Sequence, residues 1–205
     1  MNKMTPTLKA LTLAAVVLLI AGCNTLSKDA KSSSMIVIVS LTGTTVAGDD
    51  VAYLQSDVMG SDALVHADNA TANLIARLIN PGSGEGPSQF NDVVLTNYRV
   101  TYELPAGGGT PGVDVPLAFD GNFSTVTCPV DEEVSVPFIV VLESAKLAAP
   151  LVGLVGTNTV LQTKAKIEMF GHDLTDHEVS ATGYLTIYFA DYQGTVGAAV
   201  KTVKK

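Results

Sequence analysis

The feature that most restricts the fold of this chain is a long alternation of side chains between positions 94 and 104. A period of two places successive side chains on opposite faces of a β-strand, and an α-helix does not produce it. The alternation therefore predicts one strand with a buried face and a solvent-exposed face. We expect the buried face to carry Val94, Thr96, Tyr98, Val100, Tyr102 and Leu104, and the exposed face Asn97, Arg99, Thr101 and Glu103.

The same period recurs along the chain from Met35 onward, so we expect about seven strands. Turn formers such as Asn80-Pro81-Gly82 and the Gly107-Gly108-Gly109 run separate them. Pro137 indicates an edge strand, because proline cannot donate to a central ladder. The expected strands are 35–39, 69–78, 94–104, 118–128 (or a tight hairpin there around Asp120-Gly121-Asn122), 134–142, 161–169 and 181–189.

Two segments depart from this pattern. Residues 43–61 mix glycine and aspartate with apolar residues, and we interpret them as a long loop or an edge excursion. Residues 144–154 have helical character that Pro150 interrupts, which predicts one short helical crossover. About seven strands with one face buried and one face wet favour a single Ig-like antiparallel β-sandwich, with a jelly roll as the alternative. The sandwich domain is expected over 35–195, followed by a flexible tail over 196–205.

The first 22 residues have the parts of a secretory signal. Lys3 and Lys9 are the only charged residues before an apolar core of 12 residues, 10–21. A membrane-spanning helix needs about 20 residues, so this core is too short to remain as an anchor. The segment 1–22 is therefore expected to be removed.

The core ends in Ile20-Ala21-Gly22-Cys23, which resembles the lipobox of bacterial lipoproteins. The resemblance implies cleavage between Gly22 and Cys23 and acylation of Cys23, for example with palmitate. A single acyl chain holds a protein only marginally, whereas two or more anchor it stably. The residue after the cysteine is Asn24, and in this respect the chain resembles the lipoproteins that are sorted to the outer membrane. Residues 23–34 are then expected to be the lipidated cysteine and a polar, flexible tether.

Charge excludes one class of partner. The chain has 12 basic and 20 acidic residues, and removal of 1–22 takes away two lysines and no acid, leaving 10 and 20 and a net charge of −10. Such a chain repels nucleic acid, and we expect no nucleic-acid partner. Acylation of Cys23 leaves Cys128 as the second and last cysteine, so no intramolecular disulfide is available, and we expect Cys128 to be a buried structural thiol.

The densest group of potential metal ligands is His172-Asp173-Leu174-Thr175-Asp176-His177. Histidine and carboxylate side chains bind transition metals. However, Asp and Thr are also ordinary turn formers that bond their own backbone, so we interpret this segment as a turn with two exposed, independent histidines.

Two acidic segments, Asp120-Gly121-Asn122-Phe123-Ser124 and Asp131-Glu132-Glu133, resemble calcium ligands in composition. The spacing is not that of a calcium loop, because Thr125 occupies the position that needs glycine. The glycine-rich loops lack the lysine of a phosphate-binding loop. We therefore expect no catalytic residues, no metal site and no cofactor, and hence no enzyme.

Five further segments carry turn and strand patterns rather than catalytic motifs. They are Tyr98-Arg99-Val100-Thr101-Tyr102, Pro111-Gly112-Val113-Asp114-Val115-Pro116, Phe119-Asp120-Gly121, Phe170-Gly171-His172-Asp173 and Ser180-Ala181-Thr182-Gly183-Tyr184. Together they resemble a group of uncharacterised bacterial lipoproteins with an Ig-like sandwich, over about 91–191. The resemblance implies the fold and an envelope location, and adds no activity.

Two functions follow as hypotheses. The first is a lipid-anchored, non-catalytic interaction or structural module that docks another envelope protein. The second is a lipoprotein that binds a small ligand or a metal ion such as calcium through the loops at one end of the sandwich. The sequence does not separate them, because neither requires a catalytic motif.

Overall fold

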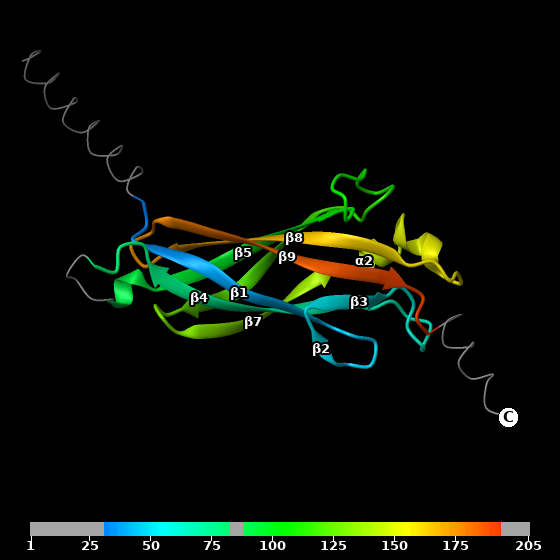
Figure 1. The fold of residues 1–205 in the computed structure, drawn as a ribbon, viewed down its shortest axis with the longest axis horizontal. Coiled ribbons are helices and arrows are strands. Elements are labelled where there is room, and N and C mark those ends of the chain that lie inside the picture. Colours follow the sequence, from blue (N-terminus) through cyan, green and yellow to red (C-terminus); the bar gives the residue numbers. More distant parts are fainter. Residues whose placement is uncertain (1–30, 83–87, 194–205) are drawn as a thin grey trace, which may run out of the picture.

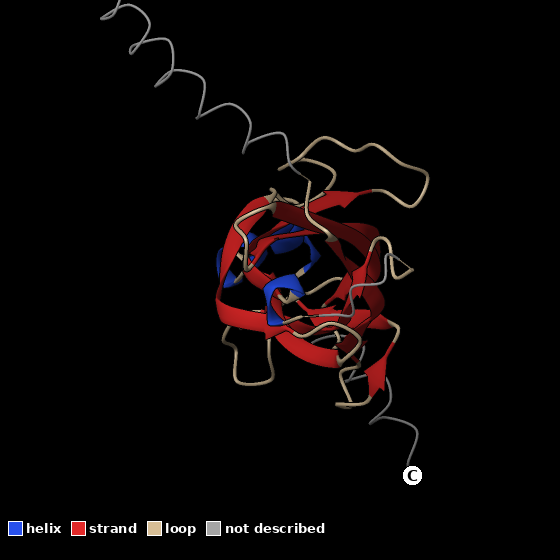
Figure 2. Ribbon diagram, turned by 90° about the vertical axis from the view of Figure 1, so that its left-hand side faces the viewer, coloured by secondary structure: helices blue, strands red, loops and turns tan. Residues whose placement is uncertain are grey.

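The computed structural model describes residues 31–82 and 88–193, which form two β-sheets packed face to face (Figure 1, Figure 2). One sheet has the strand order β2-β1-β4-β7 and the other the order β3-β9-β8-β5-β6. The predicted all-β sandwich is confirmed. The strands are β1 (Ser34–Thr44), β2 (Asp50–Val51), β3 (Tyr53–Asp57), β4 (Asp68–Leu78), β5 (Val93–Glu103), β6 (Phe119–Cys128), β7 (Glu133–Val141), β8 (Leu161–Asp173) and β9 (Glu178–Ala190).

The connection between the sheets follows an Ig-like plan. After β1, the chain crosses from the four-stranded sheet to the edge of the other sheet, where β3 runs parallel to β9. The other neighbouring pairs among the described strands are antiparallel. β3, from the first half of the chain, therefore lies beside β9, the last described strand. The described chain enters and leaves the sandwich at opposite ends (Figure 1).

Residues 43–61 were expected to be a loop or an edge excursion, and the structure shows two short strands there. β2 forms a hairpin with β1, and Leu54 and Ser56 of β3 point into the core. These strands were not predicted because each strand is too short to show a period on its own. The neighbouring turn formers Gly48 and Asp49 also favoured a loop. The part of the chain that the structure describes accordingly has nine strands rather than about seven.

The alternation in β5 changes phase at Thr96, which corrects the expected buried face. A β-bulge between Leu95 and Asn97 leaves Thr96 exposed. Before the bulge Val93 and Leu95 are buried, and after it Tyr98, Val100 and Tyr102 are buried. An extra residue shifts the side-chain period by one, so Val94 and Thr96 do not belong to the core face.

Of the two alternatives for residues 118–128, the single strand is right: β6 covers residues 119–128, and there is no hairpin within it. Asp120, Gly121 and Asn122 lie in the ladder opposite Arg99, Tyr98 and Asn97 of β5. Turn-forming residue types indicated a reversal, but in the structure they continue the sheet, and the irregularity comes later, where Thr125 has a φ of 35°.

The helical crossover is confirmed as a short helix α2 (Glu143–Lys146) and a 3-10 turn η2 (Leu151–Leu154), separated by Pro150. A second 3-10 turn, η1 (Gln89–Asn91), precedes β5. Pro137 does lie on an edge strand, β7. Cys128 is fully buried, and burial raises the pKa of its thiol to about 11, as fits a structural thiol.

The packed part of the chain begins earlier than the expected boundary at residue 35. Ser32 and Ser34 are buried, and their hydroxyl groups bond to Asp173 and to the carbonyl oxygen of Asn91. The expected tether is therefore shorter at its C-terminal side. The signal peptide 1–22, Gly22, Cys23, the tether up to residue 30 and the tail 196–205 lie outside the described residues. Within the described ranges, no helix is long and apolar enough to cross a membrane.

Candidate functional site

The candidate site is a groove along one side of the sandwich, between the free edges of the two sheets. β6 ends the five-stranded sheet and β7 ends the four-stranded sheet, and they face each other across the groove. The groove has a volume of about 450 Å³. It is lined by side chains from β4, β5, β6 and β7: Asn69, Tyr98, Asn122, Phe123, Ser124, Val126, Ser135, Val136, Pro137, Phe138 and Ile139.

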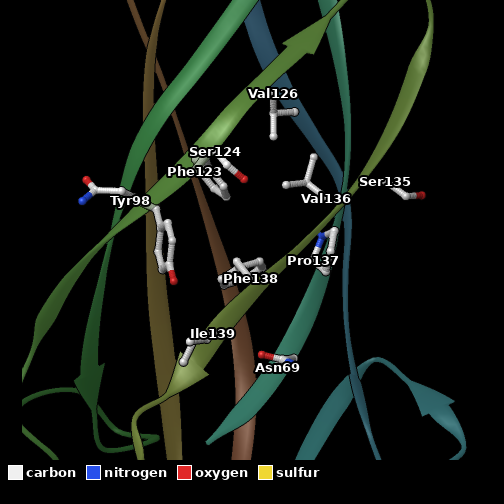
Figure 3. Close-up of a pocket in the computed structure, with 11 residues that line it drawn as sticks. Asn69, Tyr98, Phe123, Ser124, Val126, Ser135, Val136, Pro137, Phe138 and Ile139 are labelled. Carbon is white, nitrogen blue, oxygen red and sulfur yellow. The ribbon is translucent and has the colours of Figure 1, made fainter.

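The floor of the groove is aromatic. The ring of Tyr98 lies 4.9 Å from that of Phe123 and 5.3 Å from that of Phe138, measured between ring centroids. Figure 3 shows Phe123 and Val126 on the β6 side and Val136 and Phe138 on the β7 side. Edge-to-face and offset arrangements are the ones that aromatic pairs prefer. The floor is consequently a packed aromatic surface.

Aliphatic residues and uncharged polar residues form the rest of the lining. Asn69, Asn122, Ser124 and Ser135 supply amides and hydroxyls, and no charged side chain lines the groove. This differs from the chain as a whole, which carries a formal net charge of −8. The groove thus suits an uncharged, partly apolar group better than an ion.

Neither edge offers an uninterrupted ladder to an added strand. Pro137 removes one backbone donor from the middle of β7. In β6, residues 123–125 oppose the single residue Thr96, so that edge bulges outward. Proline and bulges are common protections against edge-to-edge pairing. The groove therefore offers mainly side-chain groups for contacts, rather than a continuous backbone ladder.

Gly121 shapes the groove because the ring of Tyr98 lies directly over it. A Cβ atom at Gly121 would be 2.2 Å from Cζ of Tyr98, far inside contact distance. Burial raises the pKa of the Tyr98 hydroxyl, while a hydrogen bond from the Ile139 backbone lowers it. Tyr98 thus spans the gap between β5 and β7.

The histidine-rich segment 172–177 is a turn, as predicted, but its histidines are not independent. Asp173 is its centre: Oδ1 accepts hydrogen bonds from the backbone N–H groups of Thr175 and His177 and from the Thr175 hydroxyl. His177 Nδ1 lies 2.7 Å from the same hydroxyl, and His172 Nδ1 lies 2.9 Å from the Asp173 carbonyl oxygen. Both rings are half-buried rather than exposed.

Hydrogen bonding controls the ionisation of Asp173. Burial raises its pKa, but the bonds from Thr175, Ser32 and His177 outweigh burial and lower the pKa to about 2. The carboxylate is therefore charged at neutral pH and fully occupied as an acceptor. A broad hollow of about 740 Å³ lies beside this turn, and Thr96, His172, Asp176 and Glu178 contribute to its lining.

In each of the two acidic segments considered for calcium, an aspartate forms an ion pair with an arginine. Asp120 pairs with Arg99 at 2.8 Å, and Asp131 pairs with Arg77 at 3.1 Å. Among residues 31–82 and 88–193, no three His, Cys, Asp or Glu side chains are grouped so as to hold a metal ion.

A second polar feature lies at the opposite end of the sandwich from the Asp173 turn. Lys146 of α2 has only 2% of its side chain exposed, and it lies against Asp68 at the start of β4. Its Nζ donates to Asp68 Oδ1 at 2.9 Å and to the carbonyl oxygen of Asp57 at 2.7 Å. Burial raises the pKa of the Asp68 carboxyl, and the Lys146 charge opposes that rise.

Comparison with known proteins adds no assignment. No protein-family model matches the chain, and no curated protein sequence matches it.

The groove and the Lys146 pair were not anticipated from the sequence. Pro137 was the one available signal for the groove, since it marked an edge strand, whereas nothing near Lys146 in sequence points to Asp68.

Proposed function

We propose that this protein is a lipid-anchored, non-catalytic lipoprotein of the bacterial envelope, most consistent with the outer membrane, that acts as an interaction or structural module. The observation that carries the proposal is the uncharged, aromatic-floored groove between the free edges of β6 and β7. The anchor is Cys23, which follows the lipobox-like Ile20-Ala21-Gly22.

The occupant of the groove is an apolar, uncharged segment of another envelope protein. The rings of Phe123 and Phe138 favour aliphatic or aromatic side chains, and the amides of Asn69 and Asn122 can bond to the backbone that carries them. A charged segment would leave its charge desolvated and unpaired there.

The geometry of the anchor supports this role. Eight residues, 24–31, separate Cys23 from the docked Ser32, and fully extended they span at most about 29 Å. The bond from Ser32 to Asp173 would hold the β8–β9 turn toward the bilayer. The groove, on the side of the sandwich, would stay open to a neighbouring protein.

Photo-crosslinking in intact cells tests the docking surface. A photoreactive residue replaces Ser124 on the groove rim or, as a matched control, Thr182 on the outer face of β9, which is also exposed. We expect a discrete adduct from position 124 that disappears when Ile139→Lys places a charge in the groove. No adduct from position 124, the same adduct from position 182, or an adduct insensitive to Ile139→Lys would each contradict the proposal.

A further inference from the structure

The crossover between the two sheets carries a buried lysine that the proposed function does not use. Lys146 is the last residue of α2, the short helix between β7 and β8. Its partner Asp68 begins β4, 78 positions earlier in the chain, and has 19% of its side chain exposed. Isolated buried ion pairs are costly, because taking two charges out of water offsets much of their attraction.

The nitrogen of Lys146 is held in front of the Asp68 carboxyl group. Nζ lies 2.9 Å from Oδ1 and 2.9 Å from Oδ2, so the carboxyl carbon between the two oxygens faces it. The third contact of Nζ, at 2.7 Å to the Asp57 carbonyl oxygen, fixes its position. Oδ2 has no hydrogen bond of good geometry although it is buried. When two reacting atoms are held about 3–3.5 Å apart, the reaction between them becomes effectively unimolecular and its barrier falls.

From this arrangement we propose that Lys146 and Asp68 condense to form an intramolecular isopeptide bond. A proton passes from the Nζ ammonium to the carboxylate within the pair, which gives a neutral amine and a carboxylic acid. The Nζ lone pair then attacks Cγ, an N–C bond forms, and one C–O bond breaks. The departing oxygen takes two protons that began on Nζ and leaves as water. The product is a neutral amide, and no oxidant or other reactant is needed.

The surroundings of Asp68 favour the neutral carboxylic acid that the reaction requires. Burial raises the pKa of Asp68 and so stabilises its protonated form relative to a carboxyl in water. The charge of Lys146 and the Ser56 hydroxyl both lower the pKa of Asp68, but burial outweighs them. The amide removes two buried charges and the orphaned oxygen together, which the ion pair cannot do.

The bond would tie the crossover helix to β4 and thereby close one end of the sandwich covalently. β4 belongs to the four-stranded sheet, and the crossover leads into β8 of the five-stranded sheet. The closure lies far from the Asp173 turn, where the chain comes from the anchor. A covalent tie there would protect an exposed envelope domain from unfolding and proteolysis.

Tryptic digestion of the full chain, purified from membranes in detergent and denatured before digestion, tests the bond directly. Trypsin cannot cleave after an acylated lysine. We expect peptide 32–77 joined to an uncleaved peptide 100–164, with the summed mass reduced by one water. Separate peptides 32–77, 100–146 and 147–164 would overturn the proposal and leave an ordinary ion pair.

Lys146→Arg provides the matched control. Arginine keeps a cation against Asp68, but its guanidinium stays protonated and is not a nucleophile. We expect this variant to give the three separate peptides and to be cleaved faster by protease in its native state. Because the wild-type digest decides the question alone, the test holds even if the variant folds poorly. A joined peptide in Lys146→Arg would also overturn the assignment.

Discussion

The hydroxyl of Ser32 donates a 2.7 Å hydrogen bond to Asp173 Oδ2 and so joins residues 141 positions apart. Both groups are buried, and the bond fastens the start of the described chain to the turn between β8 and β9. Ser33 and Ser34 add bonds to Asn91 beside it. Residues 32–34 are therefore part of the folded domain and fix where the described chain enters it.

Asp173→Asn should change the pH dependence of stability in a defined direction. The folded-state pKa of about 2 lies below the ordinary aspartate value of 3.8, so the carboxylate stabilises the fold above about pH 4. That contribution is about 2 kcal/mol and is lost as the pH falls through about 2. Urea unfolding at several pH values should show a difference between wild type and variant that is full near neutrality and nearly absent at the acid end. A constant difference would show that the charge of Asp173 is not what stabilises the turn.

Gly121→Ala should destabilise the domain and distort the groove. The new methyl group would meet the Tyr98 ring at 2.2 Å, and the ring is packed between Phe123 and Phe138 and cannot yield freely. We expect a loss of about 1–3 kcal/mol in the free energy of unfolding, as for other overpacked sites. Gly153→Ala is the control, since nothing lies within 4 Å of its added Cβ. Similar melting temperatures for the two variants would contradict this account of the groove.

Tyr102→Phe should cost about 1–2 kcal/mol, because it removes one hydrogen bond and leaves a buried acceptor without its donor. The Tyr102 hydroxyl donates to the Val140 carbonyl oxygen at 2.6 Å across the sandwich, and the residue is 3% exposed. Tyr184, with 54% exposed, lies on the outer face of β9. Tyr184→Phe should leave the free energy of unfolding unchanged. Equal losses in the two variants would mean that the cross-sheet bond contributes nothing.

The bulge in β5 gives a prediction that differs from the simple alternation. Val100→Asp buries an unpaired charge and should cost several kcal/mol. Thr96→Asp should be nearly silent, because the bulge leaves Thr96 exposed. Chemical denaturation of the two variants measures both effects. Severe destabilisation by Thr96→Asp would instead indicate that Thr96 is buried, as an uninterrupted alternation predicts.

The sequence predicted those features of the fold that depend on local pattern. The positions of β8 and β9, the edge position of Pro137 and the broken helical crossover all follow from periodicity and proline chemistry. The bulge at Thr96 was missed because it depends on how β5 pairs with both of its neighbours, β6 and β8. A single strand's sequence does not contain its partner's register.

The site was less predictable than the fold, for the same reason. Ser32 and Ser34 have the composition of a linker, and their bonding partners lie far away in sequence. Lys146 is one charged residue in a short helix until the fold brings Asp68 against it. The groove arises from two strand edges that only the assembled sandwich places side by side.

Membrane fractionation of the Cys23→Ser chain tests most directly the claim that a single lipid anchor attaches the folded sandwich to the membrane. We expect the wild type to stay with the membrane after a carbonate wash. A second chain, in which an ordinary secretory signal cleaved before Asn24 replaces residues 1–23, controls for an uncut leader. Both altered chains should be soluble and should melt as cooperatively as the wild type. Aggregation, or retention of the second chain in washed membranes, would contradict the single-anchor account.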